Sequence, residues 1–235
     1  MTKQKRAVAL PRELSDRLAA AILTARNEAG PAQVVRVAVD GPDVAGKTTF
    51  ANQLAVALKR RGLDIIRASA DDFQHPRCHR YQRGALSPLG YYFDAFDYQR
   101  LKQELLAPLG PRGNQRYRRA YFDWRADRLR PAPWSIAAEG AILLLDGVFL
   151  LRPSLRHFWD VAIYVHSTPW TSLSRAVLRD GAAERQSLVH RYRKRYLPAQ
   201  HGYRSACRPC QRADVIIDNN DFARPLASFQ RHDLC

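Results

Sequence analysis

Residues 41–48 of the chain are Gly41-Pro42-Asp43-Val44-Ala45-Gly46-Lys47-Thr48. The stretch satisfies G-x-x-x-x-G-K-[ST] at every fixed position, the pattern of a loop whose backbone N–H groups surround phosphate oxygens. A β-branched run at 34–39 precedes it, and apolar residues recur at helical spacing over 48–61. The loop therefore joins a predicted strand to a predicted helix, as the motif requires, and places phosphate at a helix N-terminus, where the dipole favours negative charge.

Four further strands are predicted along the chain, at 64–70, 143–148, 161–165 and 213–218, with helical patterns between most of them. Strands that alternate with helices imply βαβ units, a mostly parallel sheet and helices on both of its faces. We therefore expect an α/β fold, a three-layer doubly wound domain of the P-loop type. A length of 235 residues allows one sizeable domain or two small ones, and no Gly/Ser-rich linker marks a second.

The expected single domain, 1–235, has several recognisable parts. An N-terminal segment at 1–32 contains an amphipathic helix over 11–29. The stretches 74–92 and 108–133 fall outside the strand and helix alternation, so we expect insertions on the substrate side within 74–133. A helical pattern at 169–180 leads into a lid with its following helix at 175–203.

The composition indicates a folded, basic protein. Hydrophobic residues make up 46% of the chain and charged residues 26%, which excludes disordered and collagen-like chains. The net charge is +16, and 32 of the 38 basic residues are arginines. Arginine suits phosphate because its planar fork pairs with two oxygens, although the codon usage of a GC-rich genome would give the same excess.

Membrane and secretory signals are not apparent in the sequence. The longest apolar stretch, 141–151, is interrupted by Asp146 and is shorter than the ~20 residues that a membrane helix needs. The basic start of the chain is followed by a charged segment rather than by a signal-peptide core. The four cysteines, which include the single pair Cys207-x-x-Cys210, do not make a disulfide scaffold, so we expect a cytoplasmic protein.

Acidic residues follow two of the predicted strands at the edge where ligands bind in an open parallel sheet. Asp71 and Asp72 follow the strand at 64–70, and Asp146 closes the apolar run 142–145. A single acid after a strand is often a turn former or a helix cap. Two such places beside a phosphate loop suit phosphoryl transfer, which needs a carboxylate to accept a hydroxyl proton and another to hold Mg²⁺ or its water. We expect Asp71 to be the base and Asp146 the metal acid.

The segment after the fourth strand is rich in arginine. Arg175 and Arg179 lie in the helical pattern, Arg185 follows them, and 191–195 holds three more arginines and a lysine. Such density favours a mobile lid, because arginines that close over a transferring phosphoryl group stabilise its charge and exclude water. A solvated basic helix face is the plainer interpretation. A nucleic-acid surface is another, since tyrosines, a phenylalanine and a tryptophan stand among the arginines of 112–130.

Four elements in this order resemble the uridine kinase family, within the wider group of phosphoribulokinase and pantothenate kinase. They are the phosphate loop, Asp71-Asp72-Phe73, Asp146-Gly147 and the stretch 172–180. The resemblance covers about residues 33–219, and its R-x-x-x-R-D stretch and the strand Ala213-Asp214-Val215-Ile216-Ile217 favour uridine kinase in particular. It implies ATP-dependent phosphorylation of a nucleoside, uridine or cytidine, at its 5′-hydroxyl.

The resemblance also implies roles for individual positions. Asp71 matches the catalytic aspartate of D-x-F, Thr48 the Mg²⁺-binding hydroxyl, and Asp146 stands where the family usually has Glu. Tyr92-Phe93 replaces the usual His-Pro beside the nucleoside-binding stretch 94–97. The lid has Glu184-Arg185-Gln186 and lacks the usual Gly-Arg after Glu-Arg.

The expected site follows from the motifs and the resemblance together. Its catalytic residues are Asp71, Lys47 and Arg179. MgATP binds residues of the loop and lid, Gly41, Pro42, Asp43, Val44, Ala45, Gly46, Lys47, Thr48, Thr49, Arg175, Arg179 and Arg185. The acceptor contacts Asp71, Phe73, Arg77, Tyr92 and Asp94, and Mg²⁺ contacts Thr48, Asp71 and Asp146.

The sequence leaves two other functions open. A kinase of another hydroxyl compound, such as a sugar phosphate or a pantothenate-like acid, has the same loop and base. A nucleotide-dependent nucleic-acid-binding or regulatory protein would account for the net charge of +16.

Overall fold

The β-branched run ahead of the phosphate loop forms β1 (Val35–Asp40), an inner strand of a six-stranded sheet with the order β10-β9-β8-β1-β7-β2. The computed structural model describes residues 11–180 and 185–230. Parallel to β1 run β2 (Ile65–Ser69), β7 (Ile142–Asp146), β8 (Val161–His166) and β9 (Val215–Asp218), while β10 (Leu226–Phe229) pairs antiparallel with β9 at the edge. The carboxyl ends of five strands therefore meet at one edge of the sheet.

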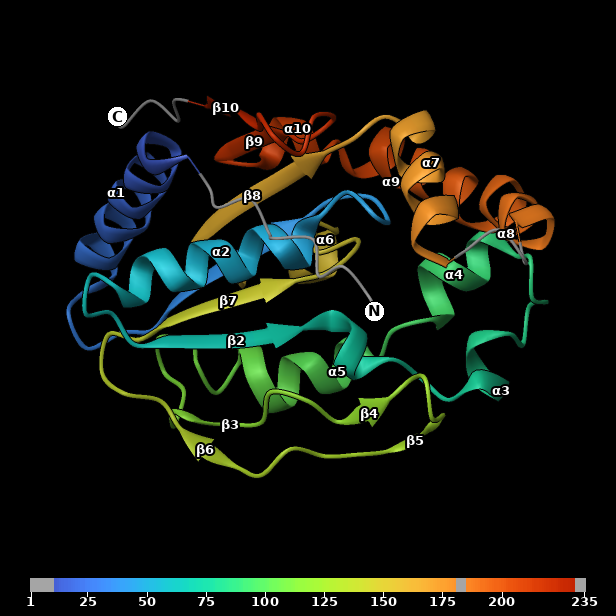
Figure 1. Cartoon of the computed structure of the whole chain (residues 1–235). Helices are drawn as coiled ribbons and strands as arrows, with labels where there is room; N and C mark the ends of the chain where they lie inside the picture. Colours follow the sequence, from blue (N-terminus) through green and yellow to red (C-terminus); the bar gives the residue numbers. More distant parts are fainter. Residues whose placement is uncertain (1–10, 181–184, 231–235) are drawn as a thin grey trace, which may run out of the picture.

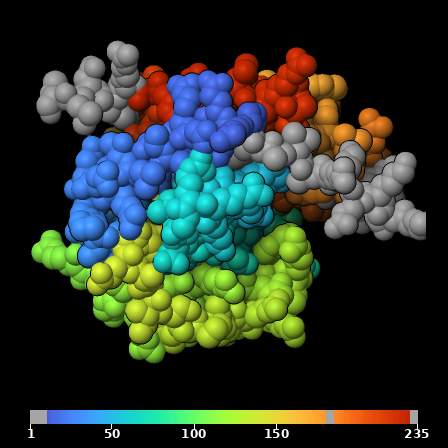
Figure 2. All heavy atoms as spheres, turned by 60° about the vertical axis from the view of Figure 1, so that its left-hand side comes forward, coloured from blue at the N-terminus to red at the C-terminus, as the bar shows by residue number. Residues whose placement is uncertain are grey.

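Side chains of the inner strands alternate between two hydrophobic cores. Val35, Val37 and Val39 of β1 pack under α1 (Arg12–Ala29) and α2 (Lys47–Lys59). Ala38 joins the core on the opposite face, which α9 (Leu197–Cys207) helps to cover. Strands that are buried on both faces are typical of a parallel sheet between helical layers. Figure 1 shows these layers, and Figure 2 shows the α1 and α2 side of the surface, with the segment around 110–140 forming its lower part.

Short elements occupy the chain between β2 and β7. The helical ones are η1 (Ala70–Phe73), α3 (Arg77–Arg80), α4 (Pro88–Asp94), α5 (Tyr98–Leu101) and the π-helical turn η2 (Lys102–Leu106). Two antiparallel pairs follow, β3 (Arg116–Tyr117) with β6 (Ser135–Ile136) and β4 (Phe122–Asp123) with β5 (Arg128–Leu129). The pairs lie along the lower side of the molecule in Figure 1.

The remaining helices follow β7 and β8. α6 (Pro153–Arg156) leads into β8, and α7 (Pro169–Asp180), α8 (Arg185–Arg191) and the π-helical turn η3 (Tyr192–Tyr196) lead into α9 and α10 (Pro209–Arg212). α7, α8 and α9 gather above α4 at one end of the molecule (Figure 1). In the ranges 11–180 and 185–230, no helix is long and apolar enough to cross a membrane.

The predicted fold class is confirmed, with differences in detail. The strand expected at 143–148 is Ile142–Asp146, and the strand expected at 213–218 begins at Val215. Asp146 is therefore the last residue of its strand, at the edge where a ligand would bind. β10 and the short elements between β2 and β7 are additional to the prediction, because elements of two to seven residues carry too little periodicity to read.

Candidate functional site

The backbone of the phosphate loop requires glycine at positions 41 and 46. Gly46 is the N-cap of α2 with φ 93°, and a side chain there would meet Phe222 at 2.6 Å and Asn219 at 2.7 Å. A Cβ at Gly41 would overlap the carbonyl of Val165 on β8. Val44 also has a positive φ, 58°, which is strained for a β-branched residue and is often associated with a functional loop. Lys47 is buried, and its Nζ donates to the carbonyl oxygen of Pro42 at 2.7 Å, across the loop.

Thr48 and Asp146 meet at the carboxyl edge of the sheet. The Thr48 hydroxyl donates to Asp146 Oδ2 at 2.5 Å, which joins the start of α2 to the end of β7. The other oxygen, Oδ1, accepts from Nη2 of Arg67 on β2 at 2.7 Å. Three elements thus converge on one carboxylate that is 2% exposed.

Asp71 lies in η1, directly after β2, within electrostatic reach of Lys47, Asp146 and Asp43. Gln74 Nε2 donates to its Oδ1 at 3.1 Å. Although Asp71 is solvent-exposed, the protein around it removes part of its hydration, and this raises the pKa of its carboxyl. The Lys47 charge acts in the opposite direction and lowers that pKa, whereas the Asp146 charge raises it.

Asp72, the next residue of η1, lies within electrostatic reach of the carboxylates of Asp71 and Asp146. Partial burial raises its pKa to about 6, and the charges of Asp71, Asp146 and Asp123 act in the same direction. Arg119, from the segment between β3 and β4, opposes the shift. The backbone carbonyl of Asp72 also accepts from the Tyr121 N–H at 2.9 Å, so this insertion is tied directly to η1.

Asp43 of the phosphate loop is hydrogen-bonded to two helices. Its carboxylate accepts from the hydroxyl of Tyr91 on α4 at 2.7 Å and from Nε2 of Gln200 on α9 at 3.2 Å. Both carboxylate oxygens therefore have partners on helices outside the loop. Asp43 therefore joins the phosphate loop to α4 on one side and to α9 on the other.

The buried Asp40, at the end of β1, supports the loop from below. Its carboxylate accepts from the Gly41 N–H at 2.7 Å, from the Leu151 N–H at 3.3 Å and from the Tyr203 hydroxyl of α9. Burial raises the pKa of Asp40, while these hydrogen bonds and Lys47 lower it. α9 thus makes two polar contacts with the loop region, one at Asp40 and one at Asp43.

The arginines predicted for the lid occupy different environments. Arg175 Nη2 donates to the carbonyl oxygens of Asn219 and Asn220 at 2.7 and 3.0 Å, and its guanidinium lies 3.7 Å from the ring centroid of Phe222. Asn219 in turn donates to the Ala45 carbonyl of the phosphate loop at 2.6 Å. Arg175 therefore fastens the segment after β9 onto the loop.

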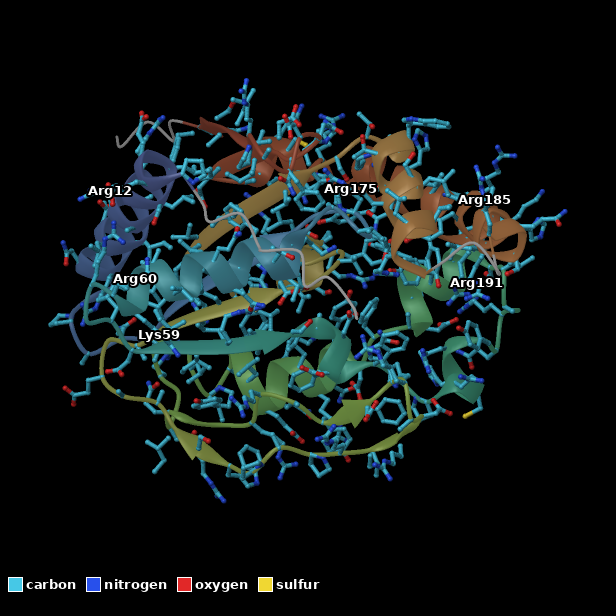
Figure 3. The ribbon with its side chains drawn as sticks, in the orientation of Figure 1. Arg12, Lys59, Arg60, Arg175, Arg185 and Arg191 are labelled. Carbon is cyan, nitrogen blue, oxygen red and sulfur yellow. The ribbon has the colours of Figure 1, made fainter. Side chains whose placement is uncertain are left out.

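Arg179 and Arg185 are solvent-exposed on α7 and α8. Figure 3 shows Arg185 and Arg191 on α8, apart from Arg175 on α7. Residues 181–184, between α7 and α8, lie outside the described residues, and so does the Glu184 of the expected lid pattern.

The residues expected to contact the acceptor are only partly available. Phe73 is 1% exposed and packs in the core, and Asp94 is buried with its Oδ2 accepting from Arg83 Nε at 2.8 Å. The Tyr92 ring lies 4.1 Å from the Arg152 guanidinium, and its hydroxyl is 3.6 Å from Cys207 Sγ. Arg77 is solvent-exposed beside the β4–β5 pair, where its N–H donates to Asp127 at 2.8 Å.

Sequence reasoning missed Arg67, Asn219 and Tyr203. Arg67 carried a readable signal, because an arginine inside the run Ile65-Ile66-Arg67-Ala68 needs a buried partner. Asn219 and Tyr203 carried none, since their roles depend on which loop and helix the fold places against residues 40–46.

The donor set at the loop fits Mg²⁺. Within residues 11–180 and 185–230, no group of three or more His, Cys, Asp or Glu side chains is arranged to hold a metal ion. Mg²⁺ in kinase sites needs fewer protein ligands, because nucleotide phosphates and waters supply the rest of its octahedron. The Thr48 hydroxyl and the carboxylates of Asp71 and Asp146 are hard oxygen donors of the kind that this ion prefers.

No protein-family model matches the chain, and no curated protein matches it. Solved structures do resemble it. A provisionally assigned uridine kinase from Bacillus stearothermophilus is 24% identical with a TM-score of 0.69, over 88% of this chain and 98% of that one. A provisionally assigned fructose transport system kinase from Silicibacter sp. TM1040 is 24% identical with a TM-score of 0.68, over 82% and 95%.

A more distant structure, D-glycerate 3-kinase from Cryptococcus neoformans, is 12% identical with a TM-score of 0.54, over 81% of this chain and 90% of that one. At these identities the likeness concerns the fold. The chain therefore has an α/β fold with a mostly parallel central sheet that matches P-loop kinase structures.

Proposed function

We propose that the protein is a P-loop kinase that transfers the γ-phosphoryl group of MgATP to a hydroxyl group of a small molecule. The observation that carries this proposal is the meeting of the loop with two carboxylates at one sheet edge. Thr48 contacts Asp146 at 2.5 Å, and Asp71 lies within electrostatic reach of Lys47. This combination supplies a phosphate cradle, a metal acid and a base in one place.

Different residues of the chain bind the phosphates and accept the proton. The loop N–H groups and Lys47 hold the phosphates, and the Asp71 carboxylate accepts the acceptor's hydroxyl proton as the new O–P bond forms and the bond to ADP breaks. The raised pKa of Asp71 makes it a better proton acceptor at neutral pH than an ordinary aspartate. Mg²⁺, held through Thr48 and Asp146, would neutralise charge on the β- and γ-oxygens.

Two lid arginines complete the proposal. Arg179 and Arg185 are the residues that we expect to reach the transferring phosphoryl group when α7 and α8 close over the nucleotide. Arg175 keeps its contacts with the 219–222 segment in this account and acts by shaping the nucleotide side of the loop.

A nucleoside, uridine or cytidine, is the first acceptor to test. The motif resemblance favours it, and one structure with a similar fold is provisionally assigned as a uridine kinase. A sugar-like or hydroxy-acid acceptor is the second candidate, because Tyr92 and Asp94 are already bound to Arg152 and Arg83. The names of two other similar structures, a fructose transport system kinase and a glycerate kinase, fit that second candidate.

The test is a panel of acceptors with the mass of each product determined. Uridine, cytidine, other nucleosides, fructose, D-glycerate, ribulose 5-phosphate and pantothenate are incubated with MgATP, and ADP release is followed. We expect one acceptor class to accelerate ADP release and to gain one phosphoryl group in mass. Bound ATP with no acceptor-dependent rate across the panel would contradict the nucleoside assignment.

A further inference from the structure

Arg67 is an arginine inside a sheet strand, with a side chain only 21% exposed. It pairs in register with Leu144 of β7, two residues before Asp146. Its side chain extends toward the carboxyl edge and donates to Asp146, rather than turning out to water as most arginines do. A cation in this position needs an explanation, because burying it is costly unless it is paired.

All three guanidinium nitrogens of Arg67 have partners. Nη2 donates to Asp146 Oδ1 at 2.7 Å, and Nη1 donates to the carbonyl oxygens of Leu144 at 2.5 Å and Ala68 at 2.8 Å. Nε donates to Asn52 Oδ1 of α2 at 3.0 Å. Contacts with β2, β7 and α2 fix the plane of the guanidinium, which a lysine ammonium could not reproduce.

Asp146 is held from two sides as a result. Arg67 donates to Oδ1 and Thr48 donates to Oδ2, so the two hydrogen bonds fix the rotation of the carboxylate group. Asp146 is 2% exposed, and Arg67 is its ion-pair partner. A carboxylate with one oxygen released would be free to turn away from the Thr48 hydroxyl.

We propose that Arg67 is a positioning residue for the metal side of the site, fixing Asp146 in the orientation in which it meets Thr48. The inference rests on the proposed function, because that function assigns Mg²⁺ to Thr48 and Asp146. Groups that orient metal-binding side chains in this way influence metal affinity about 10–100-fold without touching the ion. Arg67 acts on the metal through Asp146 and makes no contact with substrate.

The test measures metal binding directly. Mn²⁺, a paramagnetic substitute for Mg²⁺, is titrated into the protein with saturating ADP, and free Mn²⁺ is measured by electron paramagnetic resonance. We expect Arg67→Ala to weaken Mn²⁺ affinity about 10–100-fold. Millimolar guanidinium chloride should restore much of that affinity by occupying the vacated space, whereas the same concentration of sodium chloride should not.

Arg36 provides a matched control. Like Arg67, it is a strand arginine paired with an aspartate, although it is buried on the inner strand β1 and Arg67 lies on the edge strand β2. Arg36 forms its ion pair with Asp160 at 2.9 Å, at the end of β1 that lies away from the phosphate loop. Arg36→Ala should lower the melting temperature yet leave the Mn²⁺ affinity within twofold of the wild type. Guanidinium should have no effect on Mn²⁺ binding in this variant.

The possible results separate the inference from the function. A folded Arg67→Ala variant with wild-type Mn²⁺ affinity would overturn the inference alone. If that variant does not fold, Arg67→Lys provides the test, because lysine keeps the positive charge and lacks the planar guanidinium. We expect weaker Mn²⁺ binding in Arg67→Lys, and unchanged binding would overturn the inference. A wild-type protein whose Mn²⁺ binding does not respond to ADP would contradict the proposed function, and the inference with it.

Discussion

Single residues of the phosphate loop have divided roles. Lys47 points across the loop to the Pro42 carbonyl, where phosphate oxygens would replace that partner. Asp43, three residues after Asp40, accepts from Tyr91 and Gln200. Both oxygens of this acid are therefore occupied by donors from α4 and α9.

Replacing Lys47 tests the loop at this scale. We expect Lys47→Ala to weaken MgATP binding about 10–100-fold, because a charge-assisted hydrogen bond contributes about 1.5–3 kcal/mol. Calorimetric titration with MgATP measures the affinity, and thermal unfolding confirms that the variant folds. Unchanged affinity in a folded variant would show that the loop does not hold the nucleotide phosphates.

Asp72 provides a prediction about stability and pH. Its folded-state pKa of about 6 lies above the ordinary value of 3.8, so the native protein binds this proton more readily than the unfolded chain does. The charged carboxylate therefore destabilises the fold in full above about pH 6, and the cost falls as the pH drops through this range and disappears below about pH 4. Asp72→Asn should raise the melting temperature by ~2–4 °C at pH 8, equivalent to about 1 kcal/mol after solvent screening.

The comparison of melting temperatures at two pH values isolates the charge. At pH 3 the variant and the wild type should melt together, since that pH lies below the pKa of Asp72 in both states and the carboxyl is largely protonated in both. An equal gain at both pH values would mean that the substitution acts through packing or hydrogen bonding and not through the carboxylate charge.

At the scale of elements, the arm formed by α8, η3 and α9 packs against the segment between α3 and α4. Its π-helical turn contains Arg195, which is 2% exposed and donates to the carbonyl oxygens of Arg80, Gly84, Ala85 and Ser87 at 3.2–3.4 Å. These carbonyls belong to the segment that connects α3 to α4. This arm and residues 80–87 are therefore joined by one buried guanidinium.

Arg195→Ala should release this connection. Four carbonyl oxygens lose a hydrogen bond, although those of Gly84 and Ser87 keep a backbone N–H donor. We expect a loss of about 2–3 kcal/mol in the free energy of unfolding. Amide hydrogen exchange in 80–87 should accelerate, while α1 and α2 exchange as in the wild type. Arg193→Ala, an exposed neighbour, is the control and should change stability by less than about 0.5 kcal/mol. Identical exchange in 80–87 for both variants would contradict the anchoring role.

At the scale of the whole molecule, the features that could be predicted from the sequence are those that leave a local pattern. Local periodicity predicts the strand, phosphate loop and helix at 34–61. The acids that follow two strands were predictable because the carboxyl ends of parallel strands lie at one edge of the sheet. The contact between Arg67 and Asp146 depends on the register of β2 against β7, and the contact between Tyr203 and Asp40 depends on where α9 docks. Such long-range pairings leave no local pattern, so they were not predictable from one sequence.

The basic residues are spread over the molecule. Figure 3 shows Arg12, Lys59 and Arg60 at the end of α1 and α2 that lies away from Arg185 and Arg191. If the net charge of +16 serves solubility and attraction of anionic nucleotides, kcat should change little between low and physiological salt. Oligonucleotide affinity that is high at low salt and falls steeply with added salt, together with weak acceptor turnover, would favour the nucleic-acid-binding alternative.

The measurement that tests the central claim most directly is a comparison of Asp71→Asn with the wild type, using MgATP and the acceptor that gives the fastest ADP release. A general base contributes about 10²–10⁴-fold, so kcat should fall by that factor while MgATP affinity stays near the wild-type value. A variant with wild-type kcat and only a higher KM for the acceptor would contradict the account, because Asp71 would then bind the acceptor without accepting its proton.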